Sequence, residues 1–111
     1  MKPIIRRLAG IEPERSICGY RQRLVSAEDK TPASVTYLAV NDAERHRHST
    51  ATEFYYVIEG SGELDLDGEL VPLTPGTLVM IPPGVAHRAA GDVKTLVIGV
   101  PPFTPEDQFP A

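Results

Sequence analysis

The most informative part of the sequence is residues 46–60, which read HRHSTATEFYYVIEG. His46 and His48 are two residues apart, and on a β-strand this spacing places both imidazoles on the same face. The small residues 49–52 follow and can turn the chain back, so that Glu53 approaches the two histidines. The segment therefore indicates one half of a metal site, with two imidazoles and one carboxylate.

A second segment supplies the remaining histidine. Residues 82–84 read Pro-Pro-Gly, a rigid turn that can deliver the side chain of His87 to a fixed point. Three imidazoles and one carboxylate suit one divalent transition metal ion, and iron, zinc, nickel, manganese and copper all remain open. We expect each imidazole to donate its second N–H to a neighbouring group that fixes its orientation. The predicted metal ligands are His46, His48, Glu53 and His87.

These residues carry a resemblance to a known family. The first segment has the pattern H-x-H-x4-E-x6-G and the second has G-x5-P-x-G-x2-H, and together they resemble the two signature motifs of the cupin superfamily. Two positions depart from the family pattern: Val40 stands where the family has a glycine, and Gly91 where it often has an asparagine. Neither is a ligand position. The resemblance runs from Val40 to Gly91 and implies a small jelly-roll barrel with the metal near one mouth.

Composition limits the class of protein. At 111 residues the chain is expected to form a single domain, and its net charge of −4 argues against a nucleic-acid partner. Cys18 is the only cysteine, so an internal disulfide is impossible and a cytoplasmic location is expected. No apolar run is long enough for a signal peptide or a membrane span.

Alternation of apolar residues and frequent turn residues predict an all-β chain. We expect an irregular arm over 1–15, a barrel over about 16–100 and a Pro-rich tail over 101–111, whose four prolines cannot continue a ladder. The predicted strands are Ser16–Ser26, Ser34–Val40, Glu53–Glu59, a Glu63–Leu73 hairpin turning at Asp67-Gly68, Thr77–Ile81 and Thr95–Val100.

Residues beside the predicted ligands are candidates for catalysis and substrate binding. Glu53 is the only anionic ligand and could leave the metal to act as a general base. Tyr55 shares its strand face and is the second catalytic candidate. Counted from Cys18, the alternation also turns Tyr20 and Gln22 inward, and Tyr37 is a third lining candidate, although ordinary core packing is the alternative for each tyrosine. With no inward lysine or arginine expected, the ligand should be neutral, or an anion held by the metal itself.

The resemblance implies dioxygenases, decarboxylases, isomerases, lyases and non-catalytic sensors alike. Our first hypothesis is a metal-dependent enzyme acting on a small organic substrate. The alternatives are a metal-dependent module that binds or senses a small molecule, and a silent structural or storage protein. Residues 54–58 are apolar on both faces of their strand, which predicts that the outer face packs on a second copy in a homodimer.

Overall fold

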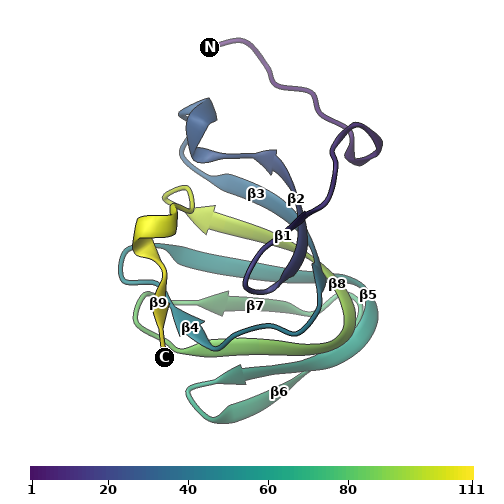
Figure 1. Ribbon diagram of the computed structural model, residues 1–111, viewed down its shortest axis with the longest axis vertical. Coiled ribbons are helices and arrows are strands. Elements are labelled where there is room, and N and C mark those ends of the chain that lie inside the picture. Colours follow the sequence, from purple (N-terminus) through teal and green to yellow (C-terminus); the bar gives the residue numbers. More distant parts are fainter.

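The computed structural model describes residues 1–111 and is built almost wholly from antiparallel strands (Figure 1). No helix in it is long and apolar enough to span a membrane. The strands are β1 (Glu14–Arg15), β2 (Gly19–Val25), β3 (Ser34–Val40), β4 (His46–Arg47), β5 (Thr52–Leu66), β6 (Glu69–Leu73), β7 (Leu78–Ile81), β8 (His87–Val100) and β9 (Phe109–Pro110). Three short 3-10 turns are η1 (Leu8–Gly10), η2 (Ala27–Asp29) and η3 (Pro105–Asp107).

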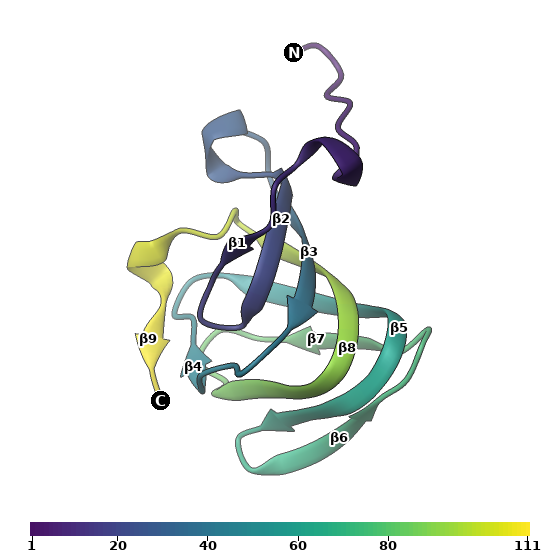
Figure 2. The ribbon, with the colours of Figure 1, turned by 45° about the vertical axis from the view of Figure 1, so that its right-hand side comes forward.

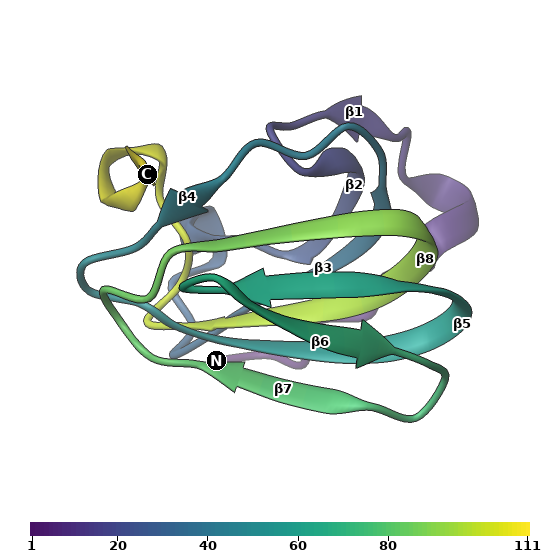
Figure 3. The same cartoon turned by 90° about the horizontal axis from the view of Figure 1, so that it is seen from below.

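Two long strands, β5 and β8, organise the sheet. They pair from Thr52–Val100 at one end to Leu66–His87 at the other, and both curl through the whole molecule (Figures 1 and 3). Their close approach requires glycine where Gly62 faces Gly91, because a Cβ added to Gly91 would lie 2.7 Å from the Cα of Gly62. β3, β2 and β1 continue the sheet from one part of β8, whereas β6 and β7 pair with β5. The curled sheet encloses one interior.

That interior is divided into an apolar end and a polar end. The apolar end contains side chains with no exposed surface, and removing them from water is the main favourable contribution to folding. These are Val57, Leu64, Leu73 and Val93. The polar end contains the histidines, which lie where β4, the start of β8 and the C-terminal segment meet (Figure 2).

The all-β prediction is confirmed, and strand β3 and the turn at Asp67-Gly68 lie where they were predicted. β8 ends at Val100, so the prolines do not continue its ladder, but the tail is not wholly unpaired, because β9 pairs with β4 and Arg47 lies opposite Phe109. A proline is acceptable in this position because β9 is an edge strand, where a missing N–H leaves no partner unpaired. The C-terminal segment therefore lies against the edge of the sheet beside the histidines.

Candidate metal centre

The four predicted ligands meet at the polar end of the barrel. His46 on β4 lies directly opposite His87 at the start of β8, His48 follows β4 by one residue, and Glu53 is the second residue of β5. All four are buried, with exposed fractions of 1% to 8%. One ligand atom from each lies within 4.8 Å of the others, so a single ion could contact the whole set.

A backbone carbonyl orients each of the three imidazoles. A carbonyl oxygen can only accept a hydrogen bond, so Nδ1 carries the proton in every ring and Nε2 presents a lone pair to the centre. This arrangement fixes the ligand tautomer in the way that metal sites require. The Nδ1–O distances are 2.9 Å from His46 to Glu44, 2.8 Å from His48 to Asp107 and 3.0 Å from His87 to Val85.

The unsatisfied atoms of the cluster fit a cation. Oε1 of Glu53 lies 2.9 Å from Nε2 of His48 and 3.0 Å from Nε2 of His87, yet none of these three buried atoms forms a hydrogen bond. A ring that carries its proton on Nδ1 alone points a lone pair at the carboxylate, so these contacts become favourable only when Nε2 gains a second proton or a cation lies between the atoms. An unpaired buried polar atom costs about 1–3 kcal/mol, and one ion between them would satisfy all three.

The ionisation states also fit a metal. Burial would raise the pKa of Glu53, but contact with the His48 and His87 imidazoles outweighs it and brings the pKa to about 2, so the carboxylate is charged. Burial and the neighbouring His87 lower the pKa of His46 to about 4, which keeps that ring neutral. Burial would also lower the pKa of His48, but Glu53 outweighs it and raises the pKa, so a proton competes with a metal for this ring.

Asp107, in the C-terminal segment, holds both His48 and the turn after it. Its backbone oxygen accepts the Nδ1 hydrogen bond of His48, while its carboxylate accepts from the backbone N–H groups of Ser49, Thr50 and Ala51, each at 2.9 Å. Burial would raise the pKa of Asp107, but these N–H groups outweigh it and lower the pKa. The C-terminal segment is therefore part of the candidate site, a role that its prolines did not indicate.

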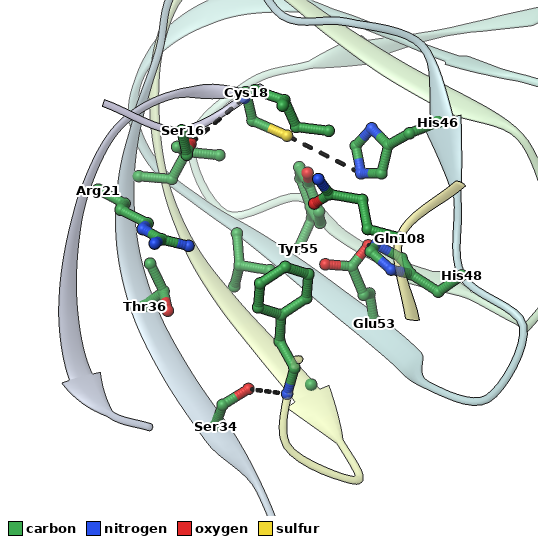
Figure 4. A pocket seen from close by; sticks show the side chains of 15 residues that line it. Ser16, Cys18, Arg21, Ser34, Thr36, His46, His48, Glu53, Tyr55 and Gln108 are labelled. Atoms are coloured by element: carbon green, nitrogen blue, oxygen red, sulfur yellow. Dashed lines mark hydrogen bonds and ion pairs between the residues drawn. The ribbon is translucent and has the colours of Figure 1, made fainter. Parts of the chain in front are cut away.

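A small cavity of about 70 Å³ opens beside the cluster (Figure 4). Three of the four candidate ligands, His46, His48 and Glu53, line it. A ligand in the cavity would thus reach the metal position from one side. The other lining residues are Ser16, Ile17, Cys18, Arg21, Ser34, Thr36, Leu38, Tyr55, Val97, Gly99, Phe103 and Gln108.

Tyr55 lines this cavity, as its shared strand face with Glu53 predicted, and is 2% exposed. Burial raises the pKa of its hydroxyl well above the ordinary value. Cys18 also lines the cavity, with Sγ 3.9 Å from Nε2 of His46. Burial and the nearby Glu53 raise the pKa of the Cys18 thiol to about 12, so it stays protonated.

The predicted inward positions of Tyr20, Gln22 and Tyr37 are wrong. Tyr20 is 48% exposed beneath the Arg15 guanidinium, and Gln22 donates hydrogen bonds to carbonyls of the N-terminal arm. Tyr37 lies opposite Gln22 in the strand register and shares its outer face.

The error arises at Gly19. Its φ of +146° breaks the extended chain between Cys18 and β2, so the alternation counted from Cys18 does not continue along the strand. A Cβ at this position would lie 2.1 Å from the oxygen of Ala39, so only glycine fits. On β2 the inward residue is Arg21, which sequence reasoning missed. Ser34 and Thr36 could have been placed in the cavity only from the alternation of β3, which puts them on the opposite face of the strand from Tyr37. No sequence pattern indicated Phe103 or Gln108.

Comparison with known proteins identifies the family. A family model described as "Cupin domain" matches residues 33–99, more than half of the chain. The polyketide synthase CurC of Streptomyces cyaneus is 32% identical over 114 residues, which cover 96% of this chain and 74% of that protein. The chain therefore belongs to the cupin family, and its fold is the jelly-roll barrel that the motifs implied.

Other relatives match over shorter stretches. MJ1618 of Methanocaldococcus jannaschii is 38% identical over 66 residues, which are 56% of this chain, and the match spans 53% of its length. A 5-nitrosalicylic acid 1,2-dioxygenase from Bradyrhizobium is 37% identical over 54 residues, which are 47% of this chain and 26% of that protein. The shared part is thus about half, or less, of these longer proteins.

Solved structures agree on the fold. A protein from Planctomyces limnophilus superposes with a TM-score of 0.92 at 32% identity and covers 97% of this chain and 96% of its own. The nucleoside dehydratase Pac13 of Streptomyces superposes with a TM-score of 0.84 at 19% identity and covers 99% of this chain and 95% of its own. The second likeness concerns the fold alone.

Proposed function

We propose that this protein is a mononuclear metal-dependent cupin enzyme that acts on a small organic substrate. The observation that carries the proposal is the set of three imidazole lone pairs and one ionised carboxylate, buried together with one side facing a cavity. A site with an open position is typical of a catalytic metal, whereas structural sites are closed. A divalent transition metal held by His46, His48, Glu53 and His87 would supply Lewis acidity toward a substrate oxygen.

Glu53 and Tyr55 are the proposed catalytic residues. Glu53 is the only anionic ligand and reaches both the cluster and the cavity, so it could take up a substrate proton. The Tyr55 hydroxyl, kept protonated by burial, could donate a hydrogen bond to the substrate. Dioxygenase, isomerase, lyase and decarboxylase reactions all fit this arrangement. The likeness to a dioxygenase favours assays that include oxygen uptake.

The substitution Glu53→Gln tests this function because it keeps the shape of the side chain and removes its charge. We expect bound metal, measured by elemental analysis, to fall modestly, and turnover across a panel of small organic substrates to fall by more than about tenfold. Tyr56→Phe, on the opposite face of the same strand, is the matched control and should change neither quantity. Full metal and full turnover in Glu53→Gln would overturn the catalytic role. Binding without turnover in the wild type would favour the binding or sensing module.

We also propose that the protein is a cytoplasmic homodimer. The outer faces of β5 and β7 carry side chains that one chain leaves uncovered: Tyr56 (45% exposed), Ile58 (43%), Leu78 (60%) and Met80 (52%). A second copy related by a two-fold axis would bury the same surface on both chains. The single cysteine supports a reducing compartment.

A further inference from the structure

Arg21 is the only lysine or arginine among the residues that line the cavity. It projects from β2, across the cavity from Glu53 (Figure 4). Its side chain is 24% exposed, so its charge is partly removed from water. A cation placed at the wall of a small cavity needs an explanation, because removing it from water is costly unless it meets an anion.

The protein uses only part of the Arg21 guanidinium. Nε lies 3.1 Å from the carboxylate of Glu14, and the two Nη groups form no hydrogen bond with the protein. Glu14 is also shared, because Nε of Arg23 lies only 2.6 Å from the same oxygen. One carboxylate between two guanidinium groups leaves one positive charge unbalanced. The free Nη edge of Arg21 is the edge that binds carboxylates in a forked pair of hydrogen bonds.

Two uncharged polar residues, Thr36 and Gln108, also line the cavity. Thr36 on β3 presents a hydroxyl that has no hydrogen-bond partner in the protein, and the Gln108 side chain reaches from the C-terminal segment into the cavity (Figure 4). Neither carries a charge. Once a divalent ion is bound, Glu53 balances only one of its two charges. Both ends of the cavity would then be positive, with no anion left to neutralise them.

The position of Arg21 also suits an incoming ligand. Arg21 and Phe103 line both the cavity and an adjoining groove of about 280 Å³, so they stand where the two meet. Glu28, Glu106 and Arg23 also line that outer groove, where two carboxylates face one further guanidinium, so the attraction for anions is strongest at the mouth and interior of the cavity.

We propose that the substrate is a small organic carboxylate, with its carboxylate on the Nη groups of Arg21 and a second oxygen directed toward the metal position. The contact with the metal position rests on the proposed function, whereas the contact with Arg21 does not. This assignment replaces the prediction from the sequence, a neutral ligand or an anion held by the metal alone, which assumed that no arginine faced inward. A larger carboxylate would extend past Phe103 into the outer groove.

Calorimetric titration of the zinc-loaded protein tests the proposal with defined probes. The probes are acetate, glycolate, pyruvate and benzoate, and glycolamide is the uncharged match for glycolate. We expect at least one carboxylate to bind, and glycolate to bind about tenfold or more tightly than glycolamide. Arg21→Gln should weaken carboxylate binding by about tenfold or more, and Arg21→Lys by less, because it keeps the charge but loses the fork.

Arg23→Gln is the matched control. It removes the same charge and the same Glu14 contact, but Arg23 lines only the outer groove and not the cavity, so affinity for acetate, glycolate and pyruvate should stay within about twofold of the wild type. Failure of all four carboxylates to bind, equal affinity for glycolate and glycolamide, or an equal loss in both glutamine variants would overturn the proposal. Zinc content is measured on every sample. A protein that retains neither zinc nor iron, nickel, manganese or copper contradicts the proposed function, whereas a zinc-loaded protein that does not distinguish the probes contradicts only the role of Arg21.

Discussion

The two faces of strand β5 differ in what covers them. On the inner face Glu53, Tyr55 and Val57 are at most 8% exposed, whereas on the outer face Tyr56 and Ile58 are 45% and 43% exposed. Both faces are rich in apolar groups, and only the inner one is covered within a single chain. Apolar residues on both sides of a strand thus indicate that both sides are buried in the working protein, but not what buries them.

The outer face extends beyond β5. Tyr56 pairs with Leu78 on β7, and Phe54 pairs with Met80. Leu78 and Met80 are 60% and 52% exposed, so the apolar groups adjoin one another across the two strands. Scattered apolar groups on a surface are common, but an adjoining set marks a contact site. In our proposal the inner face carries the chemistry and the outer face carries the assembly.

The largest effect should come from removing a ligand from the inner face. His48→Ala deletes one imidazole of the buried set, and we expect metal content and activity to be lost together. Elemental analysis of protein purified from metal-supplemented growth measures the first, and the substrate panel measures the second. Tyr56→Ala on the outer face should keep its metal. Retention of one full equivalent of metal in His48→Ala would contradict the four-ligand site.

Charges on the outer face should act on assembly alone. Leu78→Glu combined with Met80→Glu places two like charges from each chain in the proposed interface, and we expect the dimer to dissociate. Light scattering should give the monomer mass of 12.1 kDa for this variant and about twice that mass for the wild type. Leu70→Glu on β6, 63% exposed but not part of this face, should remain a dimer. A monomeric wild type at micromolar concentration would show that the apolar outer face has another use.

The smallest of the three effects should come from changing Asp107, which is not a candidate ligand but supports the ligand His48 and the turn after it. Asp107→Ala removes the acceptor for three backbone N–H groups, but it leaves the backbone oxygen that orients His48. We expect metal affinity to fall by several-fold, up to about tenfold, as the turn after His48 loosens. Competition with a chelator of known affinity measures the change. Glu106→Ala, its exposed neighbour, is the control, and equal affinities in the two variants would show that the carboxylate is not needed.

The sequence predicted the ligands better than the cavity around them. His46, His48, Glu53 and His87 could be found because their spacing is local to two short motifs, and local spacing survives small errors in strand boundaries. The cavity depends on side-chain direction along each strand, and one irregular residue reverses that direction. Gly19 did so for β2, which placed Tyr20 outside and Arg21 inside.

The C-terminal contribution could not be predicted for a different reason. Prolines at 101, 102, 105 and 110 argue against a central strand, but they do not exclude an edge strand or a segment that packs through its side chains. Phe103, Asp107 and Gln108 reach the site through tertiary contacts with residues more than fifty positions earlier. No pattern within a short window of sequence records such contacts.

The hydrogen bond from His48 to the backbone of Asp107 has a consequence for biosynthesis. The partners are separated by 59 residues, so every ligand has been synthesised well before the group that orients one of them. A nascent chain that ends between His87 and Asp107 holds all four ligands, but His48 is still free to rotate. In the proposed metal site, an ion would reach its final geometry only after residue 107 has emerged from the ribosome and folded back, which would make metal loading a late event in the life of each molecule.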